Sequence, residues 1–274
     1  MVKEKTRQKS ESNSDTSHDE ALMTTGGHLE VLRQMLFRIL GVTVVIGTVV
    51  FCFKDTTWRL LLAPSEWNFC TYRWIEQTMQ VMGMDFRFEE YHVDLIATDL
   101  SSQFMIHITT AVYLGLLGAS PFILYELFRF ISPALYDNER KYSVQVAGTI
   151  YMLFIVGVLM SYFVLFPISF RFLGTYSVAE RVHSTITLDS YVSTFVSLTL
   201  VMGLVFQLPV VAFFLGKMGF VTSEMLAKYR KHAFLVIMIV AAIITPPDLM
   251  TLILVTIPLY LLYAVSIRVV KWAE

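Results

Sequence analysis

The sequence sets a compact group of charged residues between two long apolar runs. This segment covers residues 130–142 and reads FISPALYDNERKY, with acidic residues at Asp137 and Glu139 and basic residues at Arg140 and Lys141. A carboxylate on such a short connection could bind a cation, and arginine is the cation it binds best, because a guanidinium donates two parallel hydrogen bonds. A solvated loop that only joins two helices would carry similar charges, so that simpler interpretation stays open.

Apolar and rigid residues precede the carboxylate of Glu139. Phe130, Pro133 and Tyr136 all belong to this segment, and Pro133 is expected to end the helix before it. Together they predict a conformationally restricted loop that holds the Glu139 carboxylate toward the water phase. We therefore treat this connection as the leading candidate for a binding site.

The composition places these residues in an integral membrane protein. The chain has 274 residues, of which 55% are hydrophobic and 16% charged, whereas an ordinary soluble domain has about 25% charged residues. Its net charge of -1 argues against a nucleic-acid-binding protein, which would show a basic excess. Any electrostatic recognition must therefore be local.

Six apolar runs predict an all-α membrane protein with six transmembrane helices, because about 20 helical residues cross the hydrocarbon core. The fifth run is short, and only TPPD (245–248) separates it from the sixth, which favours a hairpin over the alternative of one re-entrant segment. We expect residues 1–27 to form a disordered polar tail and residues 28–274 to form the membrane domain. The expected helices are about 36–53, 104–131, 143–166, 191–216, 232–245 and 249–267.

The basic residues predict the orientation. With six spans both termini lie on one side, and that side carries 15 of the 21 Lys and Arg residues. The positive-inside rule then places both termini in the cytoplasm. Residues 54–103 would form an outer loop whose three tryptophans favour short amphipathic helices packed as a cap on the membrane surface.

Few polar residues lie within the expected spans. His107 near the outer start of the second span, and Gln207 before Pro209 in the fourth, offer little to a proton-coupled solute transporter, which needs ionisable groups near the middle of the membrane. Gln207 either forms a functional polar site or satisfies a proline-kinked helix internally. Glu126 and Arg129 are spaced to form an ion pair at the inner end of the second span.

No catalytic or cofactor-binding pattern is found. The sequence has no GxSxG, HExxH or glycine-rich phosphate loop, and Cys52 and Cys70 have no metal-ligand spacing and could form at most one disulfide. We expect no catalytic residues, no metal and no cofactor.

Several segments resemble the TatC family, the multi-spanning core of the twin-arginine protein translocase. The pattern F-x-x-P-A-L-Y-x-x-E-R-[KR] of its first cytoplasmic loop matches residues 130–141, and further matches occur in the family's order and spacing. These are HLEVLR at 28–33, Pro64, YFVLFPISFRFL at 162–173, FQLPV at 206–210 and ITPPD at 244–248.

The resemblance implies a concave six-helix receptor in the bacterial inner membrane. Such a receptor binds the twin-arginine signal peptides of folded proteins, then recruits single-span TatA-type and TatB-type partners for export driven by the proton motive force. It also implies a hetero-oligomer with several TatC copies in contact with membrane lipid. A small-solute secondary transporter is the alternative function.

The resemblance also implies roles for particular residues. Glu139 would contact the signal arginines, while Phe130, Pro133 and Tyr136 shape its loop, and Arg33 matches the amino-terminal pattern. A second, polar group would lie within the membrane or face partner proteins: Gln207, Pro209 and Asp248.

The amino-terminal segment departs from the family's pattern. That pattern commonly reads H-L-x-E-L-R, whereas Val31 stands at the position of its glutamate and Glu30 comes one residue earlier. One residue is about 100° of helix rotation, which ordinarily moves a side chain to another face. Whether Glu30 takes over the role of the second carboxylate is therefore left open.

Overall fold

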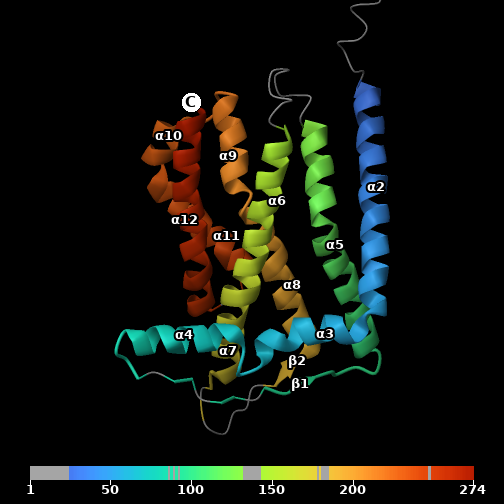
Figure 1. Cartoon of the computed structure of the whole chain (residues 1–274), viewed down its shortest axis with the longest axis vertical. Helices are drawn as coiled ribbons and strands as arrows, with labels where there is room; N and C mark the ends of the chain where they lie inside the picture. Colours follow the sequence, from blue (N-terminus) through green and yellow to red (C-terminus); the bar gives the residue numbers. More distant parts are fainter. Residues whose placement is uncertain are drawn as a thin grey trace, which may run out of the picture.

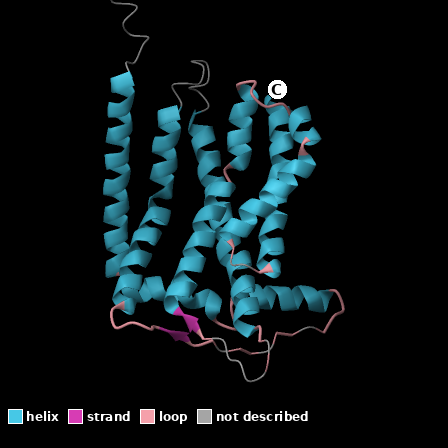
Figure 2. Ribbon diagram, turned by 180° about the vertical axis from the view of Figure 1, so that it is seen from behind, coloured by secondary structure: helices cyan, strands magenta, loops and turns pink. Residues whose placement is uncertain are grey.

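The computed structural model describes residues 25–85, 87–88, 90–91, 93–131, 143–177, 179, 185–245 and 248–274. Long helices run side by side, and short helices close one end of the bundle (Figure 1; Figure 2). Five segments in the described part are long and apolar enough to cross a membrane: Glu30–Cys52, Ser102–Leu127, Gly148–Thr175, Leu188–Lys217 and Leu249–Trp272.

The helices extend beyond the apolar runs that predicted them. Helix α2 (Thr25–Cys52) begins well before residue 36, so the last residues of the expected 1–27 tail are helical and residues 1–24 lie outside the described part. Helix α5 is Ser102–Ile131. Helix α6 (Ser143–Met160) continues through the π-helical turn Ser161–Leu165 into α7 (Phe166–Thr175).

The fourth expected helix is broken in two. Helix α8 (Leu188–Val205) and helix α9 (Leu208–Lys217) meet at a turn that contains Gln207. Pro209 has no backbone N–H to continue the α-helical ladder, which accounts for the break at this point.

The carboxy-terminal part holds three helices. They are α10 (Ser223–Lys228), α11 (Arg230–Ile244) and α12 (Leu249–Ala273). Helix α11 has 15 residues and is therefore about 22 Å long, less than the roughly 30 Å hydrocarbon core. The short fifth helix that the sequence predicted is present, two residues longer at its start.

The first outer loop folds as a cap. It contains α3 (Lys54–Leu62), the 3₁₀ turn Ala63–Ser65 and α4 (Cys70–Val81), which lie across one end of the bundle (Figure 1). Strand β1 (Leu95–Ile96) pairs in parallel with β2 (Ile186–Thr187), which follows α7. We call the segment from α3 to β1, together with β2, the cap.

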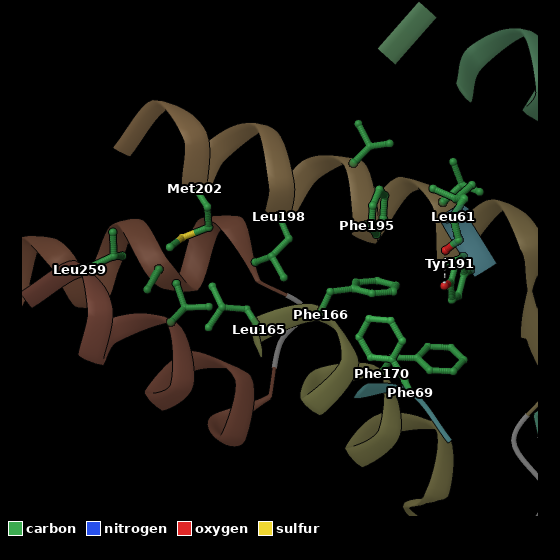
Figure 3. Close-up of a cluster of buried hydrophobic side chains, with 14 of the residues drawn as sticks. Leu61, Phe69, Leu165, Phe166, Phe170, Tyr191, Phe195, Leu198, Met202 and Leu259 are labelled. Carbon is green, nitrogen blue, oxygen red and sulfur yellow. Dashed lines mark hydrogen bonds between the residues drawn. The ribbon is translucent and has the colours of Figure 1, made fainter. Parts of the chain in front are cut away.

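A cluster of buried side chains joins the bundle to the cap (Figure 3). At its centre Phe166 of α7 meets Tyr191 and Phe195 of α8 edge to face, with ring centroids 5.0 Å apart in both pairs. Edge-to-face pairs stabilise by about 0.5–1.5 kcal/mol beyond the area they bury. The cluster therefore fixes α7 and α8 against each other directly beneath the cap.

Hydroxyl groups compensate for two prolines. A proline removes the hydrogen bond to the carbonyl four residues earlier, so Pro64 frees the Leu60 carbonyl and Pro167 frees the Phe163 carbonyl. The Tyr162 hydroxyl donates to the Leu60 oxygen at 2.8 Å, and the Thr71 hydroxyl donates to the Phe163 oxygen. Each freed carbonyl is thus satisfied from the other side of the boundary between cap and bundle.

Two tyrosines and an arginine complete the attachment of the cap. The Tyr191 hydroxyl donates to the Leu61 oxygen at 2.7 Å, and the Tyr72 hydroxyl donates to the Pro167 oxygen at 2.8 Å. Burial raises the pKa of Tyr72 far above its ordinary value, and a hydrogen bond with Tyr91 adds to this, so the Tyr72 hydroxyl keeps its proton. The Arg171 guanidinium of α7 lies over the Tyr91 ring, 4.5 Å from its centroid.

Helices α2 and α5 pack closely through small residues. A Cβ atom on Gly115 would lie 2.8 Å from the Gly47 Cα atom, and one on Gly118 would lie 2.9 Å from the Ile46 side chain. Small residues allow membrane helices to gain van der Waals contact over their backbones. These contacts make α2 and α5 one antiparallel pair, which both views show at the edge of the bundle.

Replacing Gly115 with Ala should destabilise the α2–α5 pair. The new Cβ would push the two backbones apart, so we expect the free energy of unfolding to fall by about 1–3 kcal/mol. Thermal unfolding in detergent measures this. Gly41→Ala is the matched control on α2, since its Cβ would meet no atom within 4 Å. Equal changes in Tm for the two variants would contradict the packing described.

Candidate functional site

The amino-terminal candidates lie at the end of the bundle opposite the cap. We call this end, at which α2 begins and α5 ends, the N-terminal face (Figure 1). Glu30 and Arg33 are exposed in the first turns of α2, and the Arg33 Nη1 atom lies 3.5 Å from the Glu30 Oε2 atom. The Gln34 amide also donates to Glu30, at 3.3 Å. Both charged groups therefore share one exposed face of α2.

The segment predicted to bind a cation begins at the end of α5. The backbone of Phe130 belongs to the last helical turn of α5, which ends at Ile131. Pro133, Tyr136 and Glu139 lie outside the described residues. The carboxylate role of Glu139 thus remains a prediction, but the end of α5 and the start of α2 lie at the same end of the bundle.

The expected pairing of Glu126 with Arg129 is replaced by a pairing between helices. The Arg38 Nη1 atom of α2 lies 3.5 Å from the Glu126 Oε1 atom of α5. Glu126 faces into the bundle and is buried, whereas Arg129 is exposed. Arg38 therefore serves as the partner, because it reaches the carboxylate from the neighbouring helix.

Gln207 bonds to a neighbouring helix rather than to its own. Its Nε2 atom donates to the Ile150 carbonyl of α6 at 3.1 Å, and its Oε1 atom is buried without a hydrogen-bond partner in the described part of the chain. The Gln207 amide therefore bonds to another helix, and the interpretation in which it satisfies its own kinked helix is not observed. The amide instead ties α6 to the break between α8 and α9, next to Pro209.

Asp248 caps the last helix. Its Oδ1 atom accepts a hydrogen bond from the Thr251 backbone N–H at 2.7 Å. An aspartate at this position satisfies one of the free N–H groups of the first turn and complements the positive end of the helix dipole. The acidic residue of the TPPD segment thus has a local structural role.

The remaining polar candidates are His107 and the two cysteines. The His107 ring stacks on Phe51 of α2 with centroids 4.3 Å apart and an interplanar angle of 13°. Cys52 and Cys70 are free and exposed. Among the described residues, no three His, Cys, Asp or Glu side chains gather closely enough to hold a metal ion.

Comparison with known proteins settles the family. The sequence profile of the family described as Sec-independent protein translocase protein (TatC) matches residues 27–258. The chain belongs to the TatC family. It is thus a multi-pass protein of the bacterial inner membrane and a component of the Sec-independent, twin-arginine translocase.

Relatives match the TatC chain over nearly its whole length. The TatC protein of Blattabacterium sp. subsp. Periplaneta americana is 33% identical over 246 residues, 88% of this chain and 92% of the relative. That of Carboxydothermus hydrogenoformans is 32% identical over 254 residues, 92% and 94% of the two chains. A crystal structure described as the twin arginine translocase receptor TatC has a TM-score of 0.71 at 30% identity, covering 90% of this chain and 99% of that one.

Two interactions of this TatC chain were not predicted from its sequence. The Arg38–Glu126 pair joins residues 88 positions apart, and both could also have been read as solvated charges at the ends of spans. The hydroxyl donors Tyr162 and Thr71 have no local signal either. The sequence does indicate the acceptors, since Pro64 and Pro167 each predict a backbone carbonyl that needs a donor.

Replacing Asp248 with Ala should destabilise α12. Loss of an N-cap costs about 0.5–2 kcal/mol, so we expect a lower Tm in detergent. Asp248→Asn keeps the capping oxygen and should retain both stability and export of a twin-arginine reporter. A stable Asp248→Asn protein that no longer exports would show that the negative charge, rather than the cap, is what this position supplies.

Proposed function

We propose that this chain is the signal-peptide receptor and core subunit of the translocase. In this proposal it is a concave receptor that crosses the membrane six times, with α11 as the short fifth span and both termini in the cytoplasm. It binds the twin-arginine signal peptides of folded proteins and supports their export with energy from the proton motive force. The observation that carries the proposal is the similarity to a structure described as the twin arginine translocase receptor, 99% of whose chain is covered.

The distribution of basic residues supports this orientation. The cap carries Lys54, Arg59, Arg73 and Arg87, and Arg171 of α7 packs against it, while the N-terminal face and the helices next to it carry the other nine described basic residues. This second group, among the described residues, is Arg33, Arg38, Arg129, Lys217, Lys228, Arg230, Lys231, Arg268 and Lys271. The positive-inside rule then makes the N-terminal face cytoplasmic and the cap external.

The signal-peptide site lies on the N-terminal face in this proposal. Glu139 binds a signal arginine, and Phe130, Pro133 and Tyr136 shape its loop. Arg33 and Glu30 contribute from α2, where their mutual ion pair keeps Glu30 on the face that carries Arg33. Because an exposed pair of this kind contributes little to stability, Glu30 can exchange Arg33 for an arginine of the signal at low cost.

Single-span TatA-type and TatB-type proteins are the proposed partners, together with further TatC copies and lipid. Apolar side chains exposed on α11 and α12 support contacts within the membrane, where Gln207 and Asp248 provide polar groups and Pro209 lies at the helix break beside Gln207. Those side chains include Leu235, Val236, Ile239, Ile243, Leu249, Ile253 and Ile257.

Replacing Glu139 with Gln should weaken binding of a twin-arginine peptide. A hydrogen bond to a charged group contributes about 1.5–3 kcal/mol, so we expect the Kd to rise on the order of tenfold to a hundredfold. Binding to the full chain in nanodiscs measures this, with a twin-lysine peptide as the ligand control.

Asp137→Asn is the matched protein control, because it removes a negative charge from the same loop. Its affinity should stay near that of the unmodified chain. Normal binding and export by Glu139→Gln would contradict the assignment of the site, and equal binding of twin-arginine and twin-lysine peptides by the unmodified chain would contradict the receptor function.

Lengthening α11 tests whether its shortness serves transport. A span of about 22 Å requires the bilayer to thin or the flanking lysines and arginines to reach outward. Inserting about four leucines after Val240 adds roughly one turn and should abolish export while peptide binding is retained. Unimpaired export by a correctly inserted, lengthened protein would refute a role for local thinning.

A further inference from the structure

The ion pair between α2 and α5 is unusual in its burial. The Glu126 side chain is 8% exposed and the Arg38 side chain 52% exposed. Among the described residues, Glu126 is the only Asp, Glu, Lys or Arg that is buried. An ionised carboxylate removed from water is costly unless a partner compensates its charge. Glu126 therefore depends on Arg38 far more than Arg38 depends on Glu126.

The position of the pair connects it to the N-terminal face. Ile46 of α2 lies against Gly118 of α5. Because the helices are antiparallel, eight residues toward the N-terminal face lead from Ile46 to Arg38 on α2 and from Gly118 to Glu126 on α5. Five residues further, about 7.5 Å at 1.5 Å per residue, the same register places Arg33 at the level of Ile131, the last residue of α5. The pair thus lies between the glycine contacts and the proposed signal-peptide site.

The glycine contacts alone do not determine how the two helix ends meet. They lie in the half of the pair nearer the cap, and between the described side chains of α2 and α5 the Arg38–Glu126 contact is the one ion pair. Buried polar pairs are best attested as devices that fix the register of helices. A pair at this position would set α2 against α5 where both helices leave the packed bundle.

We propose that Arg38 and Glu126 are positioning residues for signal-peptide recognition. Their ion pair aligns the start of α2, with Glu30 and Arg33, with the end of α5, from which the Glu139 loop continues. This inference rests on the proposed receptor function. Neither residue contacts the peptide: the pair acts by holding two separate parts of the binding surface in one relative position.

A direct role for Glu126 makes the opposite prediction. If Glu126 itself bound a signal arginine, Arg38 would compete with the peptide, and Arg38→Gln would leave the affinity unchanged or raise it. If the pair positions the helices, Arg38→Gln leaves a buried carboxylate without a partner and separates α2 from α5. Glu126→Gln leaves only a neutral amide and a half-exposed arginine, which is a milder change.

The experiment measures twin-arginine peptide affinity and backbone hydrogen exchange on the full chain in nanodiscs. The variants are Arg38→Gln, Glu126→Gln and the double variant, with Arg38→Lys as the charge-conserving change. Arg129→Gln is the matched control, because it removes an exposed positive charge near the end of α5. Hydrogen exchange in α8 and α9 reports whether each variant remains folded.

We expect Arg38→Gln to weaken binding on the order of tenfold and to speed exchange in the first turns of α2 and the last turns of α5. Glu126→Gln should have a smaller effect, and the double variant should return to the level of Glu126→Gln, because the unpaired carboxylate is gone. Arg38→Lys and Arg129→Gln should bind as the unmodified chain does.

Two results would overturn the proposal. Unchanged or tighter binding by Arg38→Gln would indicate that Glu126 is free to bind the peptide directly. Unchanged exchange in α2 and α5 would show that the pair does not position the helices, whatever happens to affinity. If the unmodified chain fails to distinguish twin-arginine from twin-lysine peptides, the receptor function fails instead, and hydrogen exchange still decides the positioning role.

Discussion

Two backbone carbonyls that prolines free, those of Leu60 and Phe163, need donors from within the protein, and the hydrogen bonds that satisfy them join the cap to the bundle. The Leu60 carbonyl receives the hydroxyl of Tyr162, and the Phe163 carbonyl receives that of Thr71. Each donor comes from the opposite side of the boundary between cap and bundle. The same bonds that make the prolines tolerable therefore attach the cap to α7 and its π-helical start.

The cap is attached at the end of the bundle opposite the N-terminal face. The buried cluster around Phe166 and the aromatic rings over Arg171 concentrate rigid packing beneath the cap. Toward the N-terminal face, the Arg38–Glu126 ion pair joins α2 to α5. In the proposed function, the signal peptide binds at this end of the bundle, opposite the cap.

Much of the fold could be predicted because membrane spans are encoded locally, as runs of apolar residues. The hydrogen bond from Gln207 to the Ile150 carbonyl could not be predicted, because the two residues lie 57 positions apart in the sequence. At the site, Glu139 remains a prediction from its loop and family pattern, because it lies outside the described residues. The partner of Glu126 was not predicted, because i,i+3 spacing favours Arg129 locally while burial between helices favours Arg38.

In the proposed function a twin-arginine peptide binds across the N-terminal face, between the start of α2 and the loop after α5. Photo-cross-linking tests it most directly: a signal peptide with a photoreactive residue next to its arginine pair is bound to the full chain in nanodiscs, and the adducts are mapped by mass spectrometry. We expect adducts within residues 28–34 and 130–141. Adducts confined to α3, α4 or the other residues of the cap would contradict it.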